Sequence, residues 1–113
     1  MPKIEEVSFA KLVSNGKVYR APLIAYPDKI DGRWWRKDGQ RFSPEDFDAV
    51  IEASPEVVVL GVGFTAKVSV PEETKKRFED AGIELIVADT PEAVEQYNSF
   101  LGKQKVIGAF HLM

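Results

Sequence analysis

Apolar positions recur with two different periods along the chain. The change of period separates a first part rich in strands from a second part in which helices and strands alternate. Two apolar runs, at residues 4–13 and 17–26, flank Asn15-Gly16. Asn-Gly between such runs predicts a β-hairpin, because both central residues of its tight turn need a positive φ angle. Pro22 lies inside the second run and predicts an edge position or a bulge, since proline cannot donate a ladder hydrogen bond.

The segment after this hairpin is rich in turn signals. Asp-Gly pairs at residues 31–32 and 38–39 flank Trp34-Trp35, which predicts a tight excursion with a turn at each end. The excursion ends at Ser43-Pro44, a helix start, because serine is a good cap and proline suits the first helical position.

The second part alternates amphipathic helices with strands. Residues 57–62, 83–88 and 106–112 are mostly apolar and rich in β-branched side chains, a pattern typical of strands covered on both faces. Helical spacing predicts three helices between and before them. Their expected core positions are Phe47, Val50 and Ile51 in the first, Phe78 and Ala81 in the second (ending at Gly82), and Ala93, Val94, Tyr97, Phe100 and Leu101 in the third (ending at Gly102).

This order of elements predicts one α/β domain over residues 1–113. We expect an N-terminal β-hairpin region and a central mixed sheet flanked by about three helices. Short connections favour right-handed crossovers, so strands 57–62 and 83–87 should be parallel neighbours. The pattern leaves the direction of the last strand open.

Composition adds several exclusions. The 113 residues are 44% hydrophobic and 29% charged, which is ordinary for one soluble globular domain. There is no cysteine and one histidine, so cysteine-based sites and multi-histidine metal sites are excluded. A net charge of −3 argues against general nucleic-acid binding. No apolar run approaches the ~20 residues needed to span a bilayer, and no signal-like start is present, so we expect a cytoplasmic protein that does not enter membranes, without a cofactor or a metal.

Residues 57–67, VVVLGVGFTAK, resemble the start of a nucleotide site, because Gly61, Gly63 and Ala66 have the spacing Gly-x-Gly-x-x-Ala. That fingerprint requires a helix to begin within the glycine motif, so that its N-terminus meets the phosphate. Here the chain continues through β-prone residues to a helix start near Pro71. The dinucleotide interpretation is therefore disfavoured.

Two interpretations of this loop remain open. Gly61 and Gly63 could serve only close packing where the strand leaves the sheet. Alternatively, the loop from Gly61 through Phe64 to Lys67 could bind an anion or small molecule at a strand's carboxyl end, with Thr65 and Lys67 supplying a hydroxyl and a cation.

Trp34, Trp35 and Arg36 form the second candidate site. Large aromatics mixed with cations favour stacking on an anionic ligand or a partner surface. The competing interpretation places the tryptophans in the core and the cations in solvent. We interpret His111, in the last strand, as a structural residue, because no activating partner is visible in the sequence.

Taken together, these motifs resemble the Mth-domain family of unknown function, which includes the adipogenesis-associated Mth-domain protein and is related to mitochondrial complex I assembly factors. The resemblance covers nearly the full chain and depends on the order of its pieces. Those pieces are Ser8-Phe9, Tyr19-Arg20, Trp34-Trp35-Arg36, residues 60–64, Val70-Pro71, residues 81–83, residues 90–93, Tyr97-Asn98 and residues 109–112.

The resemblance implies a compact α/β fold and no established enzyme activity. We therefore expect a non-enzymatic protein-interaction or assembly module, with Trp34 or Trp35 and Phe64 as an exposed apolar patch. The alternative is a small-molecule or anion-binding protein, including an unrecognised enzyme, with its site at Gly61–Lys67 and Arg36 nearby. The oligomeric state and the identity of any partner or small anionic ligand stay open.

Overall fold

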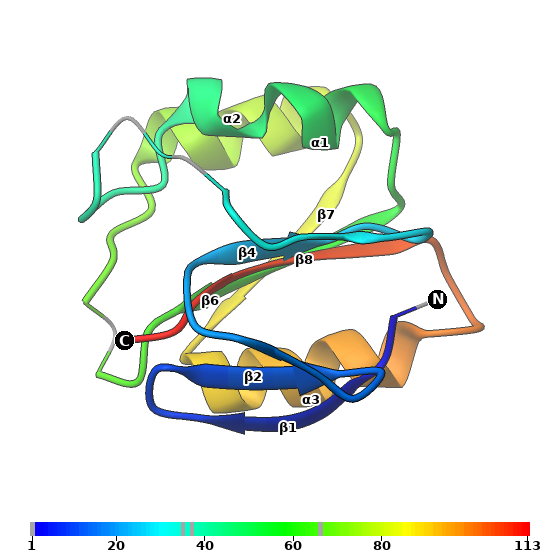
Figure 1. Ribbon diagram of the computed structural model, residues 1–113. Helices are drawn as coiled ribbons and strands as arrows, with labels where there is room; N and C mark the ends of the chain where they lie inside the picture. The colour runs from blue at the N-terminus through cyan, green and yellow to red at the C-terminus, as the bar shows by residue number, and fades with distance from the viewer. Residues whose placement is uncertain (1, 35, 37, 66) are drawn as a thin grey trace.

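A computed structural model describes residues 2–34, 36, 38–65 and 67–113, which form a three-stranded and a five-stranded sheet with three α-helices. Figure 1 shows α1 and α2 over one face of the larger sheet, and α3 with the smaller sheet under the other. The elements are β1 (Ile4–Ser8), β2 (Lys11–Ser14), β3 (Lys17–Tyr19), β4 (Leu23–Ala25), β5 (Ile30–Asp31), the 3₁₀ turn η1 (Pro44–Phe47), α1 (Asp48–Glu52), β6 (Val57–Val62), α2 (Glu72–Asp80), β7 (Glu84–Ala88), α3 (Thr90–Phe100) and β8 (Val106–His111).

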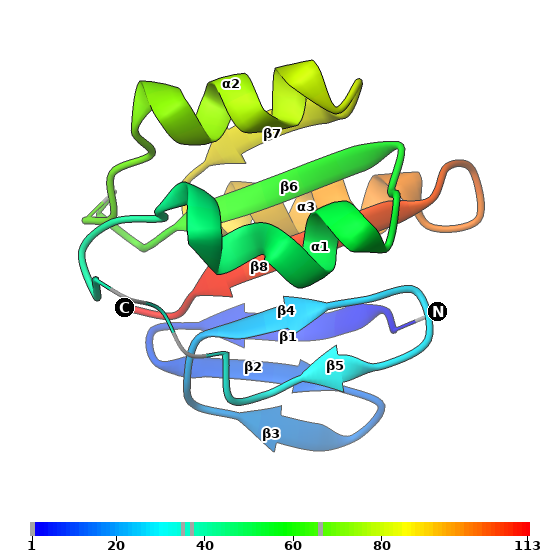
Figure 2. The same ribbon diagram turned by 90° about the horizontal axis from the view of Figure 1, so that it is seen from above.

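The larger sheet is mixed, with the order β5-β4-β8-β6-β7, which Figure 2 shows from above. β8 runs parallel to β6 and antiparallel to β4, and this settles the direction that the sequence left open. β6 and β7 are parallel neighbours, as predicted. The expected α/β architecture with a mixed sheet is thus confirmed.

The N-terminal region contains more turns than the apolar pattern predicted. Asn15 and Gly16 have positive φ angles of 53° and 75° and join β2 to β3, as expected for their tight turn. The first apolar run, however, is itself broken by a second turn at Ala10, which has a φ of 59° and separates β1 from β2. Pro22 interrupts the second run between β3 and β4, and β4 then pairs in the larger sheet.

The helices begin where the sequence predicted, but the first one begins as a 3₁₀ turn and not as an α-helix. The Ser43 N–H donates to Asp46 Oδ2 at 2.9 Å, but the first turn after it is a 3₁₀ helix before α1 begins. At α3 the cap is Asp89, whose carboxylate accepts from the N–H of Glu92 at 3.0 Å. Gly82 ends α2 with a φ of 72°. Ala81, expected in the core, is exposed because it lies at the end of α2.

The position of β7 in the sheet also differs from the prediction. The sequence predicted a strand covered on both faces, whereas β7 lies at the edge of the sheet and its Val87 side chain is 42% exposed. β6, with the same kind of sequence, is buried at every position. An apolar run alone does not distinguish a central strand from an edge strand, because that depends on which strands pair later in the chain.

Two apolar clusters fill the spaces above and below the larger sheet. Under α1 and α2, the rings of Trp34, Phe42 and Phe47 all contact one another, and Phe47 also contacts Phe78. The centroids of the contacting rings are 5.2–5.9 Å apart. On the other face, Tyr97 of α3 packs edge-on against Phe110 at 5.7 Å.

Helix α3 also fastens the smaller sheet to the rest of the molecule. Asn98 accepts from the N–H of Ile4 at 3.0 Å and donates to its carbonyl at 2.9 Å, so it pairs with β1 as a strand would. The Tyr97 hydroxyl donates to the carbonyl of Pro2 at 2.7 Å. Burial raises the pKa of that hydroxyl, so it stays a donor.

Thr90, the first residue of α3, joins the carboxyl ends of β6 and β8. Its buried hydroxyl donates to the carbonyl of His111 at 2.6 Å and accepts from the N–H of Gly63 at 2.9 Å. Its own N–H donates to the carbonyl of Gly63 at 3.1 Å. One side chain therefore sets the spacing of the two strand ends from which the candidate site projects.

Replacing this hydroxyl tests its contribution to stability. We expect Thr90→Val, which keeps the shape of the side chain, to lower the free energy of unfolding by about 1–3 kcal/mol, because the Gly63 N–H loses its partner. Thr90→Ser, which keeps the hydroxyl, should cost less. Urea unfolding of the three proteins measures the difference, and equal losses in Val and Ser variants would contradict this role.

Candidate functional site

Backbone pairing brings the turn-rich segment against the loop that follows β6. The Phe42 N–H donates to the Ser69 carbonyl, and the Ser69 N–H donates to the Gln40 carbonyl, both at 3.0 Å. The Thr74 hydroxyl of α2 donates to the Phe42 carbonyl at 2.7 Å and anchors this crossing. As a result, the two stretches singled out in the sequence lie at the same end of the molecule.

Arg36 is the charged centre of this end. Its guanidinium lies over the rings of Trp34 and Phe42, with its central carbon 5.6 Å and 5.3 Å from the ring centroids. Nη2 lies 3.2 Å from Nδ1 of His111. Nη1 is buried and has no hydrogen-bond partner within the described part of the chain. The two aromatic faces and the imidazole therefore hold the guanidinium plane in one orientation.

The contact with Arg36 determines the form of His111. A guanidinium only donates, so Nδ1 must accept, and the imidazole proton then resides on Nε2. Burial, with the positive charges of Arg36 and Lys67, lowers the pKa of His111. His111 is therefore a neutral acceptor at physiological pH, which agrees with the structural role expected from sequence but gives it a specific partner.

Burial likewise lowers the pKa of Arg36, while the carboxylates of Asp46 and Asp38 act in the opposite direction. An arginine side chain nevertheless stays protonated in proteins. The guanidinium is therefore charged in a half-buried position, and its two acidic neighbours favour this protonated form.

The glycine loop lies on the other side of the imidazole. A Cβ placed on Gly63 would lie 3.2 Å from Cδ2 of His111, and its φ of 102° is itself a conformation that other residues avoid. A Cβ on Gly61 would meet Phe110 and Thr90, each at 3.0 Å. The close-packing interpretation of both glycines is therefore supported by geometry.

Beyond the glycines, the loop exposes its polar residues. Thr65 and Lys67 are exposed, and the loop closes through a hydrogen bond from the Val68 N–H to the Val62 carbonyl at 3.1 Å. Lys67 lies close enough for its charge to act on His111. His111 contacts Arg36 through Nδ1 and lies against the Gly63 backbone, so it is a common neighbour of Arg36 and the Gly61–Lys67 loop.

The apolar patch differs from the one expected. Trp34 is only 8% exposed and belongs to the core, while Trp35 lies outside the described residues. Phe64 is half-buried and contacts Phe9, whose ring centroid is 5.8 Å away. Phe9 is 61% exposed, and it lies in the turn between β1 and β2. The exposed aromatic surface is therefore formed by Phe9 and Phe64.

We call the surface formed by Phe9, Arg36, Phe64, Lys67 and His111 the cationic end. Figure 1 shows that the turn between β1 and β2, the loop after β6 and the end of β8 lie together, away from the N-terminus. Sequence reasoning did not assign Phe9 or His111 to a site. The signals were present, since Phe9 is a large aromatic in a turn and His111 follows a buried strand, but neither points to a partner by itself.

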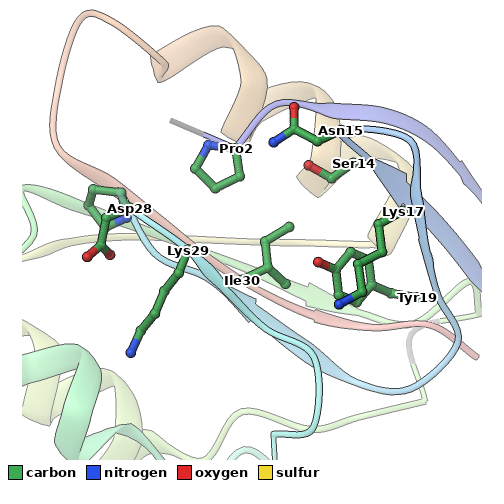
Figure 3. Close-up of a pocket in the computed structure, with 9 residues that line it drawn as sticks. Pro2, Ser14, Asn15, Lys17, Tyr19, Asp28, Lys29 and Ile30 are labelled. Carbon is green, nitrogen blue, oxygen red and sulfur yellow. The ribbon is translucent and has the colours of Figure 1, made fainter.

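A cavity of about 380 Å³ lies elsewhere, between the β2–β3 turn and the β4–β5 connection. Figure 3 shows Asn15 and Lys17 on one side of it and Lys29 and Ile30 on the other. It is open to solvent, and the ammonium group of Lys29 extends away from the other labelled side chains. The cavity contains none of the residues singled out in the sequence as candidate site residues.

Two kinds of feature were not found in the part of the chain that the structure describes. Among residues 2–34, 36, 38–65 and 67–113, no group of three or more histidine or acidic side chains could hold a metal ion. Within the same residues, no helix combines the length and hydrophobicity that crossing a bilayer requires.

The chain is similar to a family of unknown function and to solved structures of the same fold. Residues 4–111 match the model of a family described as "Protein of unknown function (DUF498/DUF598)". The conserved hypothetical protein PH1505 from Pyrococcus horikoshii OT3 is 26% identical, over 98% of both chains, with a TM-score of 0.88.

Two further solved structures share the fold at lower identity. The protein MT938 is 19% identical over 100% of this chain and 99% of its own, with a TM-score of 0.81. A Bordetella pertussis protein, described as a Mth938-like domain, is 15% identical over 98% of this chain and 85% of its own, with a TM-score of 0.72. These likenesses confirm the fold that the resemblance implied.

The tight packing at Gly61 can be tested against a glycine in open space. We expect Gly61→Ala to lower the free energy of unfolding by about 1–3 kcal/mol, because the new methyl group meets the Thr90 backbone. Gly39→Ala, where a methyl group would meet nothing within 4 Å, is the matched control and should be nearly neutral. Thermal unfolding compares the two variants, and equal effects would contradict the packing role.

The single histidine allows the electrostatics to be measured directly. We expect the His111 pKa, followed by proton NMR, to lie below its ordinary value of 6.5 and to rise in Arg36→Gln. Because folding lowers this pKa, the contribution of His111 to stability is present above pH 6.5 and is lost as pH falls through the folded-state pKa. A His111→Gln variant should lose that part of the pH dependence. The same His111 pKa in the wild type and in Arg36→Gln would contradict the contact between the two side chains.

Proposed function

Since the chain belongs to the DUF498/DUF598 family of proteins of unknown function, we propose its function from geometry: it is a non-enzymatic protein-interaction module that binds through the cationic end. The observation that carries the proposal is the Phe9 ring, which is 61% exposed although Phe64 offers it a partner. Large aromatics and arginine are enriched where protein interfaces concentrate their binding energy.

Charge specifies the kind of partner. Arg36 contacts the neutral His111, and Lys67 is close enough to act on the same imidazole, at the end of the molecule that also carries the Phe9–Phe64 pair. A complementary segment therefore presents a large apolar side chain next to an acidic one. Charge complementarity of this kind speeds association and fixes the register of the bound segment.

Position supports the same assignment. The turn that carries Phe9 is fixed to the end of β8, because the Ala10 N–H donates to the Leu112 carbonyl at 2.7 Å. The Phe64 N–H donates to the Met113 carbonyl at 3.3 Å. The Phe9 and Phe64 rings therefore lie on a framework joined to both sheets, and a preorganised surface loses less conformational entropy on binding.

A displayed peptide library, selected on the wild-type protein, tests the proposal. We expect enriched peptides to combine aspartate or glutamate with a large apolar residue. Their affinity, measured by fluorescence polarisation, should fall at least about tenfold, equivalent to about 1.4 kcal/mol, in Phe9→Ser and in Lys67→Glu.

Val87→Ser provides the matched control, because Val87 is another exposed apolar side chain but lies on the edge strand β7. Its affinity for the same peptides should equal that of the wild type. The proposal fails when no peptide family is enriched, or when the selected peptides bind Phe9→Ser as tightly as the wild type.

A further inference from the structure

Strand β7 presents a free edge of the larger sheet. It is the last strand in the order β5-β4-β8-β6-β7, and in the described part of the chain no strand pairs with its outer side. The Glu84 N–H donates to the Glu56 carbonyl at 3.1 Å, toward the start of β6. Because backbone groups alternate in direction along a strand, those of Leu85 and Val87 point outward. We propose that β7 pairs edge to edge, in antiparallel orientation, with β7 of a second copy of the chain.

The composition of β7 fits a strand that is covered in an assembly. Natural proteins protect free edges with very short strands, prolines, bulges or lysines. β5, at the opposite edge, has only two residues, whereas β7 has five and contains neither proline nor lysine. Its pairing with β6 proceeds without a shift in register, so no bulge bends the edge away. The free edge therefore keeps the geometry that a further strand requires.

A groove of about 550 Å³ follows this edge, between β7 and α2. Figure 2 shows α2 following the line of β7 at this side of the sheet. The strand side of the groove is lined by Ile83, Leu85 and Val87, and the helix side by Lys75 and Glu79. In an antiparallel pair centred on Leu85, the two Leu85 side chains meet, and Val87 meets Ile83 of the other copy. The apolar positions on this face of the edge are therefore self-complementary.

The two charged residues of the groove select a second copy as its occupant. Helix α2 ends beside the start of β7, since the Ile83 N–H donates to the Phe78 carbonyl at 3.0 Å. Glu79 therefore lies near the start of β7, and Lys75 lies one helical turn farther, toward the end of the strand. A twofold axis exchanges the two ends of the strand. Lys75 of each copy then faces Glu79 of the other, so opposite charges meet at both ends of the groove.

The existing contacts of α2 leave these charges available. On the side of the helix that faces α1, Arg77 donates to Asp48 at 2.7 Å and holds α2 in place. On the groove side, Lys75 pairs with Glu72 of its own helix at 3.5 Å, and the Glu72 side chain is 90% exposed. Such exposed pairs contribute little free energy. Exchanging Glu72 for Glu79 of a second copy therefore costs little.

Sedimentation velocity on the whole chain, from about 10 µM to about 1 mM, tests the inference. We expect the weight-average mass to rise with concentration from that of one chain toward that of two. Hydrogen exchange by NMR should show the Leu85 and Val87 amides gaining protection over the same range, because their N–H groups enter the new strand pair. A chain that stays monomeric, or a dimer in which these two amides gain no protection, would overturn the inference.

Charge reversal tests the predicted contact between Lys75 and Glu79. We expect Glu79→Lys and Lys75→Glu each to raise the dimer Kd at least about tenfold, because each creates two contacts between like charges. An equimolar mixture of the two variants should dimerise as the wild type does, since opposite charges meet again in the mixed dimer. A mixture that stays monomeric contradicts the proposed pairing.

Lys76→Glu is the matched control for Lys75→Glu. It makes the same change of net charge on the same helix, but Lys76 pairs with Asp80 and does not line the groove. Its dimer Kd should equal that of the wild type. A loss of dimerisation in Lys76→Glu as large as that in Lys75→Glu would show a general effect of charge and would overturn the inference.

The inference goes beyond the proposed function, because the groove shares no residue with the cationic end. Phe9→Ser should lose peptide binding and still dimerise like the wild type. A monomeric wild type that binds the selected peptides overturns the β7 interface and leaves the interaction module in place. A dimer that responds to charge reversal, without any enriched peptide, supports the β7 interface and overturns the proposed peptide-binding role.

Discussion

Strand β8 holds the molecule together, because it joins the two parts of the chain in one sheet. On one side it pairs antiparallel with β4 from the strand-rich part, and on the other it pairs parallel with β6 from the alternating part. Its residues up to Phe110 are buried. The last side chain of the strand, His111, therefore emerges at a position fixed from both sides.

The cationic end is a consequence of that central position. Thr90 ties the end of β8 to the end of β6, so the glycine loop and His111 cannot move apart without breaking buried hydrogen bonds. Arg36 then contacts His111 from a segment 75 residues away in sequence. The neutral imidazole orients the Arg36 guanidinium without neutralising its charge, and this distinguishes the contact from an ordinary surface ion pair.

Local chemistry accounts for the parts of the fold that could be predicted. The Asn15-Gly16 turn, the helix starts at Ser43 and near Pro71 and the helix end at Gly82 all appear where short-range backbone preferences place them. The resemblance to Mth-domain proteins, carried by the order of short motifs, is confirmed by the family match and by the Mth938-like neighbour. The close approach at Gly61 agrees with one of the two interpretations that its position at a strand end left open.

Burial and pairing between distant segments could not be derived in the same way. Val57–Val62 and Glu84–Ala88 have similar apolar sequences, yet only the first is enclosed, because β8 returns beside it and not beside β7. Trp34 and Phe9 are both aromatic residues near turns, yet one fills the core and the other stays exposed. The sequence by itself determined where the Asn15-Gly16 turn and most helix ends lie, since caps and turns depend on neighbouring residues. Only the tertiary structure decided which side chains meet, since Arg36, Lys67 and His111 converge through long-range pairing of strands and loops.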